Sequence, residues 1–182
     1  MQLGRLLLRA TVSEVFFVHG TQKLFGWIGG YGPEGTGQFF ESLGLRPGRR
    51  NAVAAGVTET TGSILLALGL ATPAAAAGLT AVMITALRTA IWKDGIKPAT
   101  GEFEVLLAVG ALALADMGPG RLSLDAALGR ERCGPGWALA ALGAGAAGSA
   151  IAIESGRRQP QPAAERSEAA PAQAATAGAQ QQ

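Results

Sequence analysis

A few ionisable side chains stand within apolar segments, and their types could support proton transfer or the binding of a polar group. His19 lies one helical turn before Lys23, and Glu59 lies near the middle of the apolar run 51–70. Imidazole and carboxylate groups can hold or release a proton, and an ammonium group can donate hydrogen bonds to oxygen atoms. The candidate ligand-binding residues are His19, Lys23, Glu59, Arg88 and Glu104.

Glu59 is the most informative of these residues. If its segment crosses a bilayer, a carboxylate at that depth costs about 2.5 to 3.5 kcal/mol on insertion scales, so it needs a partner or a function. Small residues share its helical face, whereas branched residues occupy the opposite face. We therefore expect Glu59 to face neighbouring helices and the branched side chains to face lipid. The small residues are Ala52, Ala55, Gly56, Gly62 and Ser63, and the branched ones are Val53, Val57, Ile64 and Leu68.

The segments that carry His19 and Glu104 could bring further polar groups close to Glu59. Glu104 shares a helical face with alanines, so its helix could pack closely against those that carry His19 and Glu59. Protonatable groups inside such a bundle suit the binding of a quinone head group or proton uptake. Alternatively, they only stabilise helix packing through hydrogen bonds. For Lys23, which lies near the end of its segment, we favour the interpretation that the side chain snorkels toward the membrane interface.

The composition favours a small all-α membrane protein. Charged residues make up 15% of the 182 residues, against about 25% in typical soluble domains. A soluble Ala/Gly-rich bundle is the alternative, because no apolar run reaches about 20 residues without interruption.

The basic residues are scattered, so nucleic acid is not an expected partner. One cysteine, Cys133, and one histidine do not suffice for a dithiol relay or a Cys/His zinc site within this chain.

The apolar segments predict an integral membrane four-helix bundle with antiparallel neighbours. The spans are expected at residues 3–25, 51–70, 74–92 and 102–117, with a short amphipathic helix at 36–43. Residues 137–153 predict an additional transmembrane helix, and the tail 157–182 lacks aromatic residues and is expected to be disordered. The organisation is therefore a bundle over 1–128, a polar linker with the extra helix over 129–156, and the tail over 157–182.

The distribution of basic residues predicts the orientation of these spans. With five spans, the side that holds the loop after residue 92 carries more Lys and Arg than the other side. Because the more basic side of a multi-pass protein usually faces the cytoplasm, we expect this side to be cytoplasmic. The expected location is the inner (cytoplasmic) membrane.

Several ordered motifs resemble the DoxX family of small bacterial membrane proteins. Residues 16–37, FFVHGTQKLFGWIGGYGPEGTG, followed by two phenylalanines and the LGL of 43–45, resemble the signature region of that family. Residues 55–70, AGVTETTGSILLALGL, resemble its second span with a single Glu, here Glu59. Residues 102–107 resemble the start of its last core span, and GPGRLSLDA at 118–126 resembles its closing motif. The resemblance covers about residues 3–128.

The resemblance implies a four-helix membrane bundle in which His19, Lys23, Glu59 and a carboxylate near Glu104 are candidate site residues. Arg88 stands in the region where the family has a third-span histidine. DoxX-like proteins have been linked to quinone-associated sulfur oxidation through the related DoxD subunit, and to membrane-associated redox and detoxification complexes.

By this resemblance the protein is a non-autonomous subunit or anchor of a redox or stress-defence complex. It would bind a quinone or another lipophilic ligand, contain no intrinsic cofactor, and have oxidoreductase proteins or further copies of itself as partners. Two alternatives remain open. One is a small proton-coupled transporter in which Glu59 relays protons, and the other is a purely structural scaffold.

Overall fold

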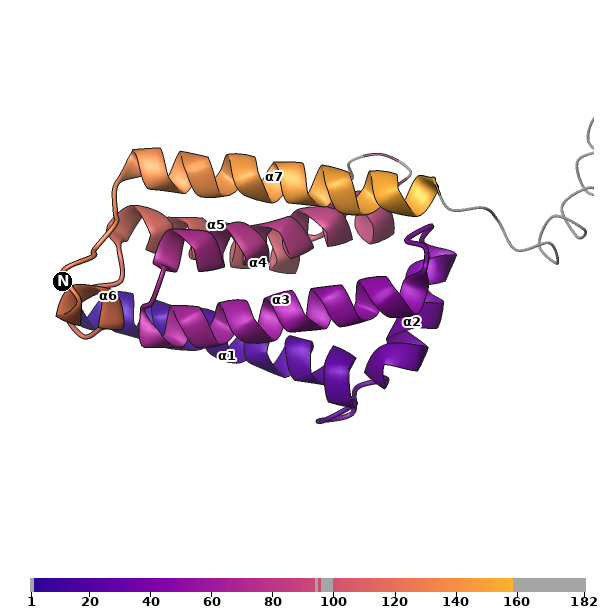
Figure 1. The fold of residues 1–182 in the computed structure, drawn as a ribbon, viewed down its shortest axis with the longest axis horizontal. Helices are drawn as coiled ribbons and strands as arrows, with labels where there is room; N and C mark the ends of the chain where they lie inside the picture. The colour runs from indigo at the N-terminus through magenta and orange to yellow at the C-terminus, as the bar shows by residue number, and fades with distance from the viewer. Residues whose placement is uncertain (1, 94, 96–99, 159–182) are drawn as a thin grey trace, which may run out of the picture.

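The structure is a computed structural model, and it describes residues 2–93, 95 and 100–158. The long helices α1, α3, α4, α5 and α7 lie side by side, and α2 packs across one end of the bundle (Figure 1). The predicted helical bundle is therefore confirmed. The elements are α1 (Gln2–Phe25), α2 (Gly32–Ser42), α3 (Gly48–Leu68), α4 (Thr72–Ala86), the π-helical turn η1 (Leu87–Ile91), α5 (Glu102–Met117), α6 (Leu124–Ala127) and α7 (Pro135–Arg157).

The link between α3 and α4 is as short as the sequence predicted. Gly69 ends α3 in the left-handed conformation with φ of 63°, and Pro73 occupies the first turn of α4. The Asp125 carboxylate accepts hydrogen bonds from the backbone N–H of Ala71 at 3.1 Å and from that of Thr72 at 3.3 Å. Asp125 therefore supplies the acceptor that the start of α4 lacks within its own sequence.

Helix α3 presents its faces as predicted. The small-residue face is buried at Ala52, Gly56, Gly62 and Ser63 together with Glu59. The branched residues on the other face are exposed, at 45% for Val57 and 43% for Ile64. This arrangement directs the carboxylate toward the neighbouring helices.

Glycines allow α1 and α3 to approach closely. A Cβ atom at Gly20 would lie 2.7 Å from the backbone nitrogen of Thr60, and one at Gly56 would lie 2.8 Å from Cγ of Leu24. Both distances are too short for a real contact, so only glycine fits without a shift. The two helices can therefore place side chains of one within hydrogen-bond reach of the other.

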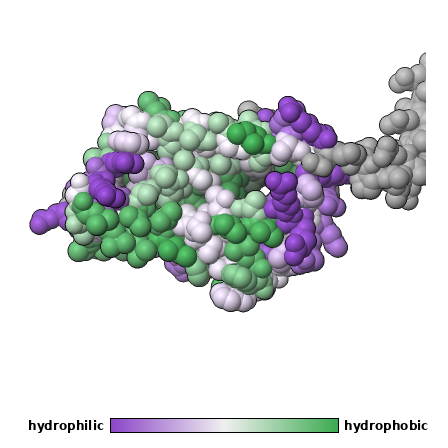
Figure 2. All heavy atoms as spheres, in the orientation of Figure 1, coloured by the Kyte–Doolittle hydropathy of each residue, from purple (hydrophilic) through white to green (hydrophobic). Residues whose placement is uncertain are grey.

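The outer surface of the bundle carries many large apolar side chains. Figure 2 shows hydrophobic residues across the middle of the visible face and hydrophilic residues toward the two ends. Among the described residues, two helical segments are long and apolar enough to cross a membrane, Thr72–Ile91 and Pro135–Arg157. Large side chains on the outer faces include Leu106, Leu139 and Ile151.

Some boundaries differ from those expected. Helix α2 begins at Gly32 instead of 36, since Pro33 suits a first turn. Residues 121–136 contain the short helix α6, which Ser123 caps by accepting a hydrogen bond from Ala126 N–H. Helix α7 continues to Arg157, where Glu154 and Arg158 form an ion pair one turn apart at 3.2 Å. The predicted disordered tail lies, from residue 159 onward, outside the described residues.

Candidate functional site

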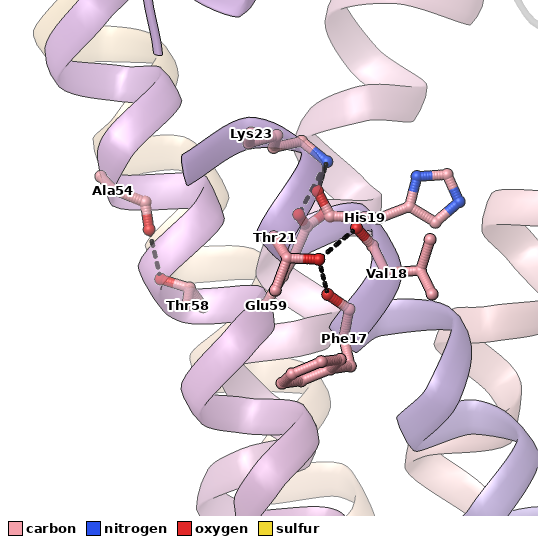
Figure 3. Close-up of polar contacts among 8 residues, drawn as sticks. All are labelled: Phe17, Val18, His19, Thr21, Lys23, Ala54, Thr58 and Glu59. Atoms are coloured by element: carbon pink, nitrogen blue, oxygen red, sulfur yellow. Dashed lines mark hydrogen bonds and ion pairs between the residues drawn. The ribbon is translucent and has the colours of Figure 1, made fainter. Parts of the chain in front are cut away.

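An ion pair joins α1 to α3 inside the bundle. Lys23 Nζ lies 2.7 Å from Glu59 Oε2 and 3.3 Å from the carbonyl oxygen of His19 (Figure 3). The Glu59 side chain is 1% exposed and that of Lys23 is 19% exposed. Lys23 therefore does not simply extend toward the interface, as its position near the end of α1 suggested. Its ammonium group is held by a buried carboxylate from another helix.

The pairing explains how both charges are tolerated inside the bundle. Each charge alone would lose its hydration on burial, and the short contact with an opposite charge offsets part of that cost. An ammonium group has three protons to donate, and two are directed to Glu59 and to the His19 carbonyl. Among the described residues, no further acceptor contacts the ammonium group.

The His19 ring occupies a different part of the site. It points away from the contact between Lys23 and Glu59 (Figure 3), and its centroid lies 5.8 Å from that of Phe103 on α5. His19 is about half-buried, and Glu104 follows Phe103 at the start of the same helix. The imidazole thus lies between the helix that carries it and α5.

These residues line one cavity of about 600 Å³. His19, Lys23, Glu59 and Glu104 all contribute to its wall. Most of the remaining lining is apolar and comes from α1, α2, α3, α4, η1, α5 and α7, including four aromatic rings. The aromatic residues are Phe16, Phe39, Phe40 and Phe103. The structure therefore brings four of the five candidate residues to a single cavity with largely apolar walls.

Arg88 is the candidate residue that lies elsewhere. Its neighbours Thr85 and Thr89, four residues apart on one helical face, line the cavity, whereas Arg88 is exposed and lines a separate hollow. The structure does not place its guanidinium beside Glu59. Lys23 alone provides the cation for that carboxylate among the described ion pairs.

Several lining residues were not identified from the sequence. Thr58, Thr85 and Thr89 place hydroxyl groups on the cavity wall, while each hydroxyl donates to a backbone carbonyl four residues earlier. In the sequence, Thr85 and Thr89 lie four residues apart in an apolar segment, and this spacing could have indicated that both hydroxyl groups lie on one face of a helix. The aromatic residues of α2 gave a weaker signal, because an interfacial helix explains them equally well.

Arg9 has a structural role at the opposite end of the bundle. Its guanidinium donates to the carbonyl oxygen of Leu122 at 2.6 Å and to that of Pro119. This contact fixes the segment between α5 and α6, and Asp125 lies directly after it, within α6. The basic residues Arg9 and Lys23 of α1 therefore make different contacts at its two ends.

The described residues contain no group of three or more His, Cys, Asp or Glu side chains that could hold a metal ion. At the cavity, His19, Lys23, Glu59 and Glu104 can supply hydrogen bonds, charge and proton exchange.

Known proteins resemble this chain over much of its length. The family model named DoxX matches residues 4–92, a range that includes His19, Lys23 and Glu59. A protein of Bacillus subtilis (strain 168) with the name "Putative oxidoreductase CatD" is 36% identical over 124 residues, which cover 68% of this chain and 86% of the relative. No solved structure gives a significant match. The family match, the identity and the shared length together show that this chain belongs to the DoxX family.

Proposed function

We propose that the protein is a multi-pass subunit of the inner membrane that binds a quinone in the cavity beside Lys23 and Glu59. It would work with an oxidoreductase partner protein that exchanges electrons with the bound quinone. The observation that carries the proposal is a cavity of about 600 Å³ with apolar walls and a buried ion pair at one side. The name of the Bacillus subtilis relative is consistent with a redox role.

The dimensions of the helices support a membrane location. A bilayer has a hydrocarbon core of about 30 Å, and a helix rises about 1.5 Å per residue. Helices α1 and α3, with 24 and 21 residues, are long enough to cross it beside the two apolar segments Thr72–Ile91 and Pro135–Arg157. Helix α5 has 16 residues and is shorter, but it packs against α4 and α7. Five spans result.

The cavity fits the chemistry of a quinone. Pockets for small molecules usually have about 300 to 1,000 Å³, with mostly apolar walls and a few polar groups that fix the orientation of the ligand. A quinone ring carries carbonyl oxygens on opposite sides, and each accepts hydrogen bonds. Lys23 and His19, on separate parts of the wall, can each donate one. The phenylalanines and the small residues of α4 and α7 suit the ring and its apolar tail.

Protonatable residues could also serve the reaction. Reduction of a quinone to a quinol adds protons to both oxygens, and these must come from water through groups near the ring. His19 and Glu59 can each exchange a proton, and both line the cavity. Lys23 would hold Glu59 in place and stabilise negative charge that develops on the ring oxygens.

Titration with a short-chain ubiquinone tests the proposal. The full-length protein in lipid nanodiscs should bind this quinone saturably, as followed by calorimetry. Because a hydrogen bond from a charged group contributes about 1.5 to 3 kcal/mol, the double variant Lys23→Met/Glu59→Gln should bind about 10- to 100-fold more weakly. The double change removes both charges and so avoids an isolated buried charge.

A matched control is Arg158→Gln, which removes an exposed cation outside the cavity. This variant should bind the quinone with the affinity of the wild type. No binding by the wild-type protein would refute the proposed ligand. Unchanged binding by the double variant would refute the proposed site. Proton-coupled solute uptake by protein-containing vesicles, lost in Glu59→Gln, would instead support the transporter alternative.

A further inference from the structure

A second hollow, of about 220 Å³, lies beside η1 and the last turn of α7. Three cationic side chains line it, namely Arg88 of η1, Lys93 just after η1, and Arg157 of α7. They come from segments about 65 residues apart in sequence that the packing of α7 along α4 brings together. We refer to this feature, defined by these three residues, as the cationic hollow.

Among the described residues, the cationic hollow has no compensating charge. None of the described residues that line it is acidic, and none of its three cations takes part in an ion pair with another described residue. Arg158, which follows Arg157 in the sequence, differs in this respect, because it forms an ion pair with Glu154 at 3.2 Å. Like charges that gather without a counter-charge repel one another, so such a site favours an anion.

The surroundings of the cationic hollow indicate which anion is available. The inner wall includes Leu43, Leu45 and Ile153, so an apolar group could lie directly next to the charged groups. The hollow is also at the common end of the two segments with the length and composition of membrane spans. This end would lie at the membrane interface, which is the depth of lipid phosphate groups.

We propose that the cationic hollow binds the phosphate group of an anionic membrane lipid, with the start of an acyl chain against Leu45 and Ile153. Arginine side chains can hold phosphate oxygens through paired N–H groups, and Lys93 adds a point charge. A hollow of about 220 Å³ accommodates a phosphate group but not a whole lipid, so the chains would remain in the bilayer.

The site is distinct from the proposed quinone site. Neither Lys23 nor Glu59 lines the cationic hollow, and none of its three cations lines the large cavity. The two do share Leu43, Leu45 and Thr89, which places a bound lipid beside the wall of the cavity. The proposal does not depend on a redox function.

Native mass spectrometry of the full-length protein in detergent tests the proposal, with phosphatidylglycerol and phosphatidylcholine as probes. Wild-type protein should retain phosphatidylglycerol more strongly than phosphatidylcholine. Each cation near the membrane surface contributes about fivefold in affinity for anionic lipid, so Arg88→Gln/Arg157→Gln should weaken phosphatidylglycerol binding about 25-fold. The conservative variant Arg88→Lys/Arg157→Lys should keep most of it.

Controls separate this site from general surface charge. Arg49→Gln/Arg158→Gln removes two exposed cations that do not line the cationic hollow. Because each already pairs with a carboxylate, Glu34 or Glu154, this double variant should change binding less than twofold. Equal retention of the two lipids, or equal effects of the two glutamine pairs, would overturn the proposal. Displacement of phosphatidylglycerol by equimolar inorganic phosphate would show a site for free phosphate and would also overturn it. Quinone binding should be unchanged in Arg88→Gln/Arg157→Gln.

Discussion

Lys23 on α1 and Glu59 on α3 form an ion pair with 2.7 Å between Nζ and Oε2, and both residues line the cavity of about 600 Å³ with largely apolar walls. The contact spans 36 residues of sequence. It therefore fixes the relative position of two helices and also supplies the polar wall of the cavity. A structural and a ligand-binding role are both compatible with the geometry, and they differ in what substitutions should do.

Removal of Lys23 alone should destabilise the protein strongly. The variant Lys23→Met leaves the Glu59 carboxylate buried without its cation, which costs about 3 to 5 kcal/mol for a buried pair. The double variant Lys23→Met/Glu59→Gln should lose much less, since no isolated charge remains. Thermal unfolding of both variants in the same detergent measures the difference. Equal losses in the single and double variants would contradict this reasoning.

Alanine at Gly20 should force α1 away from α3. Its Cβ would lie 2.7 Å from the Thr60 backbone nitrogen, so the helices must shift, at a cost of about 1 to 3 kcal/mol for overpacking. The same change at Gly143 meets no atom within 4 Å and should be neutral or slightly stabilising, because alanine favours helix. The melting temperatures of Gly20→Ala and Gly143→Ala, each compared with that of the wild type, test this difference in stability. A destabilised Gly143→Ala with an unaffected Gly20→Ala would refute the packing.

Asp125→Ala should weaken the start of α4. The substitution removes the acceptor for the N–H groups of Ala71 and Thr72, and loss of a helix cap costs about 0.5 to 2 kcal/mol. Amide hydrogen exchange should increase first at Ala71 and Thr72, whose N–H groups lose their acceptor. Asp116→Ala, which removes an exposed carboxylate, is the matched control and should leave exchange there unchanged. Faster exchange in both variants alike would show that the cap is not specific.

The exposed pair between Glu34 and Arg49 predicts a local pH response at the junction of α2 and α3. The hydrogen bond from the Arg49 guanidinium, at 2.6 Å, lowers the pKa of Glu34 below its ordinary value of 4.5. A lowered folded-state pKa means that the stabilisation is present above 4.5 and is lost as the pH falls through the folded-state pKa. Carbon-13 NMR titration should show this lowered pKa in the wild-type protein.

Arg49→Gln should return the titration of Glu34 toward its ordinary range, whereas Arg50→Gln should leave it lowered. Because both partners are exposed, the contribution of this pair to global stability is small and salt should reduce it. A titration of Glu34 that is the same in wild type and Arg49→Gln would exclude the pair in solution.

The helical segments could be predicted from the sequence because their signals are local. Helix α5 occupies the predicted range 102–117, and α3 buries the predicted small-residue face. Both follow from hydrophobic periodicity and from breakers such as Gly118 and Pro119, which act over one or two helical turns. The presence of Glu59 in an apolar helix likewise indicated that it needed a partner.

The identity of that partner depended on the packing of the helices. Periodicity along α1 does not reveal that Gly20 lets α3 approach until Lys23 reaches Glu59, and the favoured expectation was an interfacial lysine. Arg88 was grouped with Glu59 because it stands in the region where the DoxX family has a third-span histidine, yet in the structure Arg88 lines a separate hollow and does not line the cavity. Asp125 also could not be assigned to the start of α4 from local sequence.

The sequence by itself determined which segments form helices, which residue carries the buried carboxylate and which family the chain resembles, since these depend on residue types and short-range spacing. Only the tertiary structure decided that Lys23 neutralises Glu59, that four candidate residues share one cavity, and that Arg88 meets Lys93 and Arg157. The physical reason is that these relations depend on helix rotation and separation, which are set by side-chain packing between residues far apart in the chain.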